Sequence, residues 1–195
     1  MLLKKFVIFV RDVICSIGLV LISPILLIAA LLVLIEDGMP IFFIQDRIGK
    51  NKAIFKIIKI RTMKTSAPDT GTHQLDEKYQ LKCGKVFRKI KLDEFPQLIN
   101  VIKGNINLIG PRPGLPSQVE LMDARSSNNI FLIKPGITGL AQVLGYDMSN
   151  PLILATIDRK YIEKKSFMID SFILIGTFFK FPRKLLSKLI NENHD

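Results

Sequence analysis

The longest apolar stretch of the chain covers residues 13–35 and contains no charged side chain. Charged residues bound it on both sides, with Arg11 and Asp12 before it and Glu36 and Asp37 after it. A helix of these 23 residues is long enough to cross the hydrocarbon core of a bilayer. The pattern therefore predicts a membrane helix within residues 1–36.

Ser23 and Pro24 lie in the middle of this stretch, where proline removes a backbone donor and bends a helix. Each half is roughly 16–18 Å long as a helix, about half of the hydrocarbon thickness. Both flanks carry more basic than acidic side chains, and basic residues favour the cytoplasmic side of a membrane. We expect a re-entrant hairpin that breaks at Ser23 and Pro24 and returns both ends to one leaflet. An ordinary spanning helix with a proline kink is the open alternative.

The next region, residues 41–63, alternates apolar and polar side chains on either side of a turn at residues 49–51. That period predicts a β-hairpin. Residues 65–80 are polar and lack a sustained period, so we expect a mobile surface loop that can close over a site.

Apolar residues recur at helical spacing from Leu92 to Ile102, with Pro96 suited to a first turn and Gly104 to a stop. This spacing predicts a short helix that begins near residues 93 and 94. Proline and glycine then punctuate residues 110–116, which predicts a rigid loop, and a further helix is expected around residues 153–164.

The end of the chain, residues 173–190, combines aromatic and aliphatic side chains with four basic residues and no acid. Such a segment can lie in the headgroup plane of a membrane, and its alternative is a core helix with a solvated basic face. Together these patterns predict a small mixed α/β globular domain with an N-terminal re-entrant membrane helix and amphipathic interfacial helices. The predicted division is a membrane segment over 1–36 and a catalytic domain over 37–195.

Composition supports attachment to a membrane. The chain has 28 basic and 17 acidic residues, a net charge of +11, and 48% hydrophobic residues, with a mean hydropathy of +0.30. A soluble nucleic-acid binder explains the charge but not the hydropathy, whereas a basic protein on an anionic membrane explains both. A non-catalytic basic module that recruits anionic lipid or nucleic acid is the alternative from another class.

Several kinds of chemistry are disfavoured by the residues present. The chain has only two histidines and two cysteines, which argues against a zinc cluster, a serine–histidine relay and a disulfide framework. It also lacks the GxxxxGK[ST] and GxGxxG loops of ATP-dependent kinases and dinucleotide enzymes. Transfer chemistry must therefore use carboxylates and cations.

Asp93 and Glu94 are the candidate carboxylates, and five basic residues lie within residues 82–91. An acidic pair at a helix start is usually a cap and a solvated charge. A helix N-terminus and nearby cations also favour an ionised Asp93, as a nucleophile requires, and paired carboxylates can hold Mg²⁺ beside a diphosphate.

Candidate phosphate-binding cations lie elsewhere along the chain. Arg112 is framed by two prolines that stiffen its backbone, which suits bidentate contact with a phosphate; a structural salt bridge is the alternative. Lys59 and Arg61 project to one face of the second predicted strand, either as exposed residues or as a second phosphate clamp. Asp158, next to Arg159 on the expected helix, is either a surface residue or a site residue.

Longer motifs carry a family resemblance. They are VFRKIKLDEFPQLINVIKGNINLIGPRP at 86–113 and KPGITGLAQV at 134–143, followed by Asp158, Tyr161, Ser166 and Asp170. With the Ser23–Pro24 segment, this pattern closely resembles the monotopic phosphoglycosyl transferases of bacterial glycan assembly, also called bacterial sugar transferases.

The resemblance implies transfer of a sugar 1-phosphate from a UDP-sugar to polyprenyl phosphate, with release of UMP and with Mg²⁺ as cofactor. It implies that Asp93 is the nucleophile, that Glu94 assists with metal or proton handling, and that Arg112 binds phosphate. Lys59, Arg61, Arg88, Gln142 and Asp158 are further candidate substrate contacts. It also implies the cytoplasmic face of the bacterial inner membrane, membrane lipids and downstream glycosyltransferases as partners, and no nucleic acid.

Overall fold

The computed structural model describes residues 2–68, 76–179 and 181–191. The predicted loop at 65–80 therefore lies partly outside the described residues. The chain forms two compact units, one from residues 1–45 and 56–104 and the other from residues 46–55 and 105–195. Each unit has its own hydrophobic core.

The first unit contains a long N-terminal helix, α1, and two short helices that pack against it. Its elements are α1 (Leu2–Asp37), the 3₁₀ turn η3 (Glu77–Tyr79), α2 (Lys82–Lys89), the 3₁₀ turn η4 (Leu92–Glu94) and α3 (Gln97–Ile102). The core of this unit joins Ala29 and Val33 of α1 to Leu81, Phe87 and Leu92.

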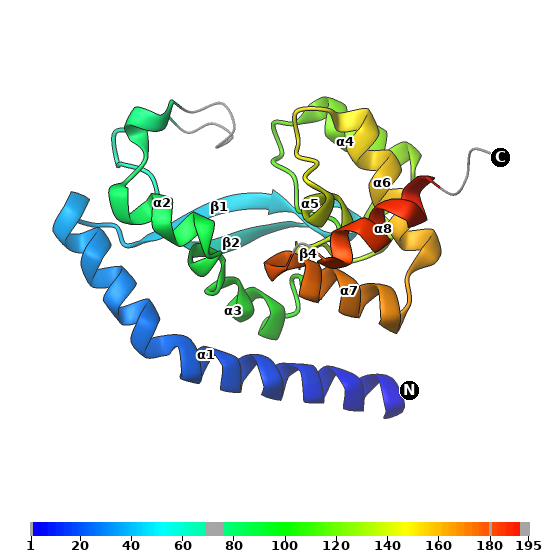
Figure 1. Ribbon diagram of the computed structural model, residues 1–195, viewed down its shortest axis with the longest axis horizontal. Coiled ribbons are helices and arrows are strands. Elements are labelled where there is room, and N and C mark those ends of the chain that lie inside the picture. The colour runs from blue at the N-terminus through cyan, green and yellow to red at the C-terminus, as the bar shows by residue number, and fades with distance from the viewer. Residues whose placement is uncertain (1, 69–75, 180, 192–195) are drawn as a thin grey trace. The chain divides into compact units, whose positions relative to one another are not determined.

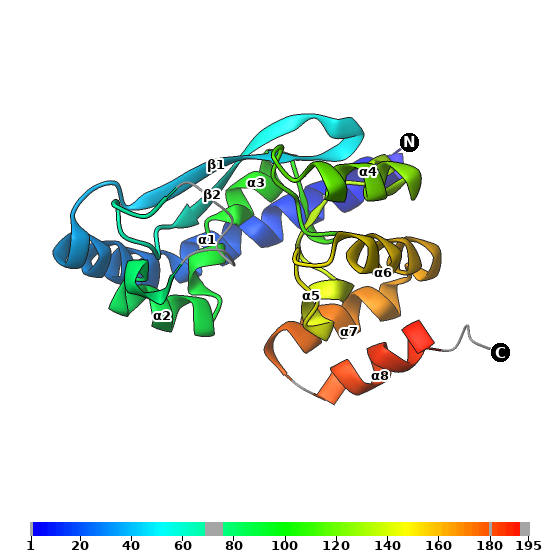
Figure 2. The same ribbon diagram turned by 90° about the horizontal axis from the view of Figure 1, so that it is seen from above.

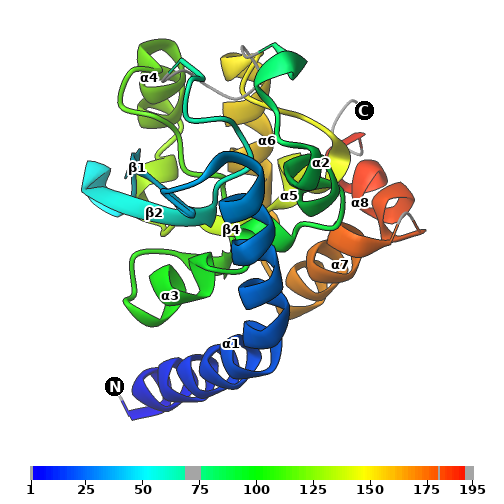
Figure 3. The ribbon, with the colours of Figure 1, turned by 90° about the vertical axis from the view of Figure 1, so that its left-hand side faces the viewer.

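Helix α1 is continuous through Pro24, and its axis changes direction partway along its length (Figures 1 and 3). Only the part of α1 from Ile22 to Val33 contributes to the core cluster of the first unit. Among the described residues, Lys5–Asp37 is the helix that is long and apolar enough to cross a membrane, and only 11% of its most apolar stretch is buried. Its exposed apolar surface is therefore unlike that of a soluble core helix. The predicted re-entrant path of this helix stays a prediction.

The break expected at Ser23 and Pro24 has a local solution. Because Pro24 has no N–H, the carbonyl oxygen of Val20 receives no helical hydrogen bond from it. The Ser23 hydroxyl donates to that oxygen at 2.7 Å. A side chain thus satisfies the freed carbonyl, as helices in a lipid environment require.

The predicted β-hairpin is confirmed, with β1 (Phe42–Ile48) and β2 (Ile54–Ile60) as its strands. The short 3₁₀ turn η1 (Lys50–Lys52) closes it, and Gly49 N–H donates to the Ala53 carbonyl at 2.8 Å. Asn51 adopts a left-handed conformation with φ of 54°, which asparagine tolerates well.

The second unit is mostly helical, and its helices pack around a core that includes Leu121, Leu154, Ile157, Tyr161 and Ile173. Figure 2 shows α5, α6, α7 and α8 following one another in this unit. Its elements are β3 (Asn107–Ile109), α4 (Val119–Ser127), the 3₁₀ turn η5 (Ile130–Leu132), β4 (Gly136–Thr138), α5 (Leu140–Leu144), α6 (Pro151–Lys164), α7 (Phe167–Phe178) and α8 (Phe181–Asn191).

Two of the motifs meet in a short parallel ladder, in which Asn107 pairs with Gly136 and Ile109 with Thr138. A Cβ atom at Gly136 would lie 2.1 Å from the backbone nitrogen of Gly110, so only glycine allows this approach. The KPGITG motif thus serves first to bring the two backbones together.

The downstream pattern also has a structural explanation. Ser166 caps α7 by accepting the N–H of Ile169 at 3.3 Å, and the Tyr161 hydroxyl donates to Asp170 at 2.8 Å. These bonds fix the turn between α6 and α7. The helix expected around 153–164 is confirmed by α6.

The apolar C-terminal region forms two helices with different surroundings. Phe178 and Phe179, at the end of α7, are 57% and 65% exposed, whereas Leu186 of α8 is fully buried in the core. Helix α8 therefore has a core face, and its predicted contact with a membrane surface stays a prediction.

Candidate active site

The acidic pair lies where the chain reverses between α2 and α3. Lys91 takes a left-handed conformation with φ of 62°, and η4 follows immediately with Asp93 and Glu94. Phe95 and Pro96 continue with helical backbone angles into α3. The pair was expected at a helix start, and it occupies a 3₁₀ turn that leads into the helix.

Both carboxylates are shielded from solvent, with Asp93 at 7% and Glu94 at 8% exposure. This burial does not fit the solvated surface pair that was the alternative for an acidic dipeptide. Buried carboxylates need charged or hydrogen-bonding neighbours, so the residues around them decide what they can do.

Lys59 is one such neighbour. Its ammonium lies 2.9 Å from Oε1 of Glu94, and the two side chains are only 13% and 11% exposed. The strand β2 thus places a positive charge directly beside the acidic pair. Lys59 is therefore not the solvent-exposed strand residue that was one of its two readings, and its role in a phosphate clamp stays a prediction.

Arg88 is on the last turn of α2, just before the chain reverses and reaches the acidic pair. Its Nε donates to the hydroxyl of Thr62 at 2.8 Å, which ties the guanidinium to the end of β2. The first unit therefore gathers Lys59, Arg88, Asp93 and Glu94 from β2, α2 and η4.

Arg61 has a different role, although it is only two residues from Lys59. It is 5% exposed, forms an ion pair with Asp37, and donates to the carbonyls of Pro40 at 2.5 Å, Gly38 at 2.6 Å and Met63 at 3.2 Å. These bonds secure the end of α1 to β2. This geometry gives Arg61 a structural role, and its role as a phosphate clamp has no support here.

The second unit holds the other candidate residues. Arg112 lies in the loop between Pro111 and Pro113, and its carbonyl accepts a hydrogen bond from Nη1 of Arg125 at 2.7 Å. Gln142 on α5 donates through Nε2 to the Ile137 carbonyl at 3.0 Å. The loop predicted to be rigid is thus held by a buried arginine.

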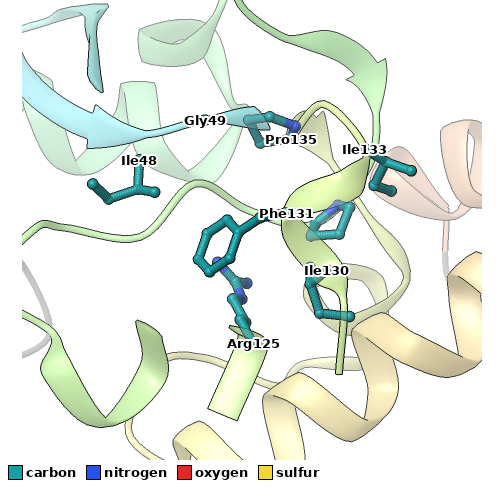
Figure 4. A pocket seen from close by; sticks show the side chains of 8 residues that line it. Ile48, Gly49, Arg125, Ile130, Phe131, Ile133 and Pro135 are labelled. Atoms are coloured by element: carbon teal, nitrogen blue, oxygen red, sulfur yellow. The ribbon is translucent and has the colours of Figure 1, made fainter. Parts of the chain in front are cut away.

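Asp158 is 3% exposed and paired with Arg125, whose Nε and Nη2 lie 3.0 and 2.6 Å from Oδ2 of the carboxylate. Burial raises the pKa of Asp158, and the charge of Arg125 opposes the rise. Asp158 is therefore not the surface partner of Arg159, which pairs with Glu163 at 2.7 Å instead. Figure 4 shows Arg125 pointing toward Phe131 in a small pocket that Ile48 and Pro135 also line.

The sequence pattern of bacterial sugar transferases matches residues 3–184, nearly the whole chain. The chain belongs to the bacterial sugar transferase family. The matched range contains both the acidic cluster and the loop around Arg112.

Curated relatives support this membership. A UDP-N-acetylgalactosamine-undecaprenyl-phosphate N-acetylgalactosaminephosphotransferase from Aeromonas hydrophila is 36% identical over 83% of this chain. The uncharacterized sugar transferase EpsL of Bacillus subtilis is 36% identical over 80% of the chain. A UDP-glucose:undecaprenyl-phosphate glucose-1-phosphate transferase from Caulobacter vibrioides is 35% identical over 80% of the chain. The match spans 40%, 76% and 62% of the lengths of these three proteins.

A metal implied by the resemblance can be tested against the sugar transferase's own residues. Among the described residues, no three histidine, cysteine or acidic side chains gather into a metal cluster. Mg²⁺ is usually bound through one or two carboxylates together with substrate phosphates, so the Asp93–Glu94 pair fits such a site. It does not fit a site made of protein ligands alone.

Two residues that contact candidate site residues carried no sequence signal. Thr62 follows β2 in a polar stretch, and Arg125 lies on a polar helix, 33 positions before Asp158. Neither spacing nor composition separates them from surface residues, and only the tertiary contacts do.

Proposed function

We propose that this sugar transferase moves a sugar 1-phosphate from a UDP-sugar to polyprenyl phosphate and releases UMP. The observation that carries the proposal is the buried Asp93–Glu94 pair with Lys59 at 2.9 Å from Glu94. The names of two relatives supply the donor class and undecaprenyl phosphate as acceptor. The chain spans only 40% of the first of these relatives, so the identity of the transferred sugar is left to the experiment below.

In the proposed reaction, a carboxylate oxygen of Asp93 attacks the phosphorus that carries the sugar. A bond forms between that oxygen and phosphorus, and the bond from phosphorus to the bridging oxygen breaks, so UMP leaves with the electron pair. An oxygen of polyprenyl phosphate then attacks the same phosphorus and regenerates the Asp93 carboxylate. A covalent intermediate thus divides one displacement into two.

The charges of the cluster suit this chemistry. An anionic carboxylate that approaches an anionic diphosphate is repelled unless cations neutralise part of the charge. Lys59 and Arg88 bring two positive side chains to the unit that holds Asp93. Arg112 and Gln142, in the second unit, are proposed substrate contacts on the family resemblance, whereas Asp158 is already engaged by Arg125.

Mg²⁺ is part of the proposal. Asp93 and Glu94 would hold it with oxygens of the diphosphate, and it would supply positive charge to the departing UMP. We expect excess chelator to abolish UMP release and added Mg²⁺ to restore it. Full activity in excess chelator would remove the metal from the proposal.

The decisive experiment is incubation with donor and no acceptor. Each of UDP-N-acetylgalactosamine, UDP-glucose and UDP-galactose is tested, with UDP-di-N-acetylbacillosamine added because a likeness to the small PglC-type transferases is part of the proposal. The peptide with Asp93 should gain the mass of one sugar phosphate. Asp93→Asn should abolish both the added mass and UMP release, whereas Asp123→Asn, an exposed acid on α4, should retain both. Full turnover by a folded Asp93→Asn variant would overturn the assignment of Asp93 as nucleophile, whereas no UMP release by the wild-type chain from any of these donors would favour the non-catalytic alternative.

We further propose that α1 enters and leaves the cytoplasmic leaflet of the bacterial inner membrane from the same side. The test compares Leu2→Cys and Lys50→Cys in a background without Cys15 and Cys83. An impermeant maleimide should label both positions from the cytoplasmic side only. Labelling of Leu2→Cys from the opposite side would establish a spanning helix.

A further inference from the structure

Thr62, two residues after the end of β2, makes contacts that no motif of the sequence explains. Its side chain and backbone both face α2, and the residue is only 6% exposed. The Thr62 carbonyl accepts the N–H of Leu81 at 3.0 Å, immediately before α2 begins. Its hydroxyl accepts Nε of Arg88 at 2.8 Å, on the last turn of the same helix. One residue therefore holds α2 at both ends.

The packing between these contacts is equally close. A Cβ atom at Gly84 would lie 2.4 Å from the Thr62 carbonyl oxygen and 2.8 Å from its Cα. Both contacts are with backbone, which cannot swing aside as a flexible side chain does. Helix α2 is thus held against Thr62 along its length, and the position of Arg88 is set by this contact.

The hydrogen bond also orients the guanidinium. An arginine can present two edges to a phosphate, one formed by Nε and Nη and the other by its two Nη atoms. Since Nε donates to Thr62, a bidentate phosphate contact would use the Nη edge. A valine at position 62 would have nearly the same shape but no acceptor, so it would leave Nε without this bond.

We propose that Thr62 is a positioning residue, which acts through Arg88 by fixing its guanidinium for contact with the donor diphosphate. This inference rests on the proposed function. It predicts that the hydroxyl, and not only the volume, of residue 62 matters for turnover.

The test measures UMP release by wild-type chain and by Thr62→Val and Thr62→Ser, each corrected for the folded fraction. Thr62→Val should lower kcat/KM about 10- to 100-fold, the effect of losing one hydrogen bond to a charged group. Thr62→Ser should stay within about threefold of wild type because the acceptor remains. Thr177→Val is the matched control, since it removes a hydroxyl paired with Thr138 at 2.8 Å in the second unit, and it should leave kcat/KM unchanged.

A second comparison separates positioning from a general loss of structure. If Thr62 acts through Arg88, adding Thr62→Val to an Arg88→Lys variant should have little effect. The kcat/KM of the double variant should be within about threefold of that of Arg88→Lys alone. A full further loss in that background, or an equal loss in Thr62→Ser and Thr62→Val, would overturn the proposal.

Failure of the proposed function can be distinguished from failure of the inference about Thr62. Wild-type chain that releases no UMP from any of the four donors would refute the function. Solvent exchange of the Arg88 Nε–H, followed by NMR in chain labelled with ¹⁵N-arginine, then still decides the role of Thr62. The exchange rate of the Arg88 Nε–H should rise at least about tenfold in Thr62→Val, because this variant loses the hydrogen bond. In Thr62→Ser the rate should stay near that of wild type, because the acceptor remains. Equal exchange rates in wild type and Thr62→Val would overturn the inference.

Discussion

The buried ion pair between Arg125 and Asp158 provides a quantitative prediction. Oδ2 of Asp158 accepts both Nε and Nη2 of Arg125, at 3.0 and 2.6 Å, and the two side chains are 3% and 4% exposed. Replacing Arg125 by methionine keeps most of the volume but leaves a buried carboxylate without its partner. Breaking a pair of this kind costs about 3–5 kcal/mol, mainly because the remaining charge stays desolvated.

The double variant should behave differently from the sum of its parts. Arg125→Met with Asp158→Leu removes both charges and replaces them with apolar groups, which is often close to neutral for a buried pair. We expect the double variant to lose about 1–3 kcal/mol, mainly because the Arg112 carbonyl no longer receives the hydrogen bond of Arg125, and this is well below the summed losses of the two single variants. The difference measures the coupling between the two side chains.

Thermal unfolding in one detergent, followed by circular dichroism, measures these effects. For a chain of this size, about 3–5 kcal/mol corresponds to a fall in Tm of roughly 6–20 °C. The control is Arg159→Met, which breaks an ion pair with Glu163. The side chains of Arg159 and Glu163 are 57% and 50% exposed, so this variant should cost less than about 1 kcal/mol. Equal losses in Arg125→Met and Arg159→Met, or additive losses in the double variant, would refute the reasoning.

Three further predictions concern the first unit. Gly84→Ala should cost about 1–3 kcal/mol in thermal unfolding and lower UMP release, because its Cβ meets the Thr62 backbone; unchanged stability would contradict this packing. Burial, followed by contact with Glu36, raises the pKa of Cys83 to about 12, so its alkylation by iodoacetamide should keep rising up to about pH 12. Glu36→Gln should accelerate that alkylation at pH 8, and a plateau near pH 9 in the unmodified chain would disprove the shift. Ser23→Ala should lower stability in lipid bilayers by about 1 kcal/mol, and no change in unfolding would mean that water satisfies the freed carbonyl.

Patterns of neighbouring residues were enough to predict the elements that depend on contacts close in the sequence. The hairpin follows from period-two alternation around residues 49–51, and α6 follows from helical spacing before Lys164. Each of these predictions depends on residues a few positions apart.

Contacts between distant residues were outside the reach of such patterns. Strands β3 and β4 have three residues each, too few to show a period, and they pair across the 26 residues that lie between Ile109 and Gly136. Pairing of Arg125 with Asp158 likewise joins two helices that each look polar or surface-like alone. Neither arrangement leaves a signal in a single sequence, since the partner of each residue is set by packing.

The two cations of β2 illustrate why charge alone does not assign a role. Lys59 lies in β2 and Arg61 directly follows its last residue, so a continued alternation of the strand would direct both to the same face. Yet the position along the strand decides which acid each meets: Lys59 reaches Glu94, within the acidic cluster, and Arg61 reaches Asp37, at the end of α1. Arg61 then fills its remaining donors with backbone carbonyls, which suits a fixed structural anchor, whereas Lys59 shares the cluster with the proposed nucleophile. The same sequence pattern thus places one cation in a structural anchor and the other in the acidic cluster, and only the acid opposite each residue distinguishes them.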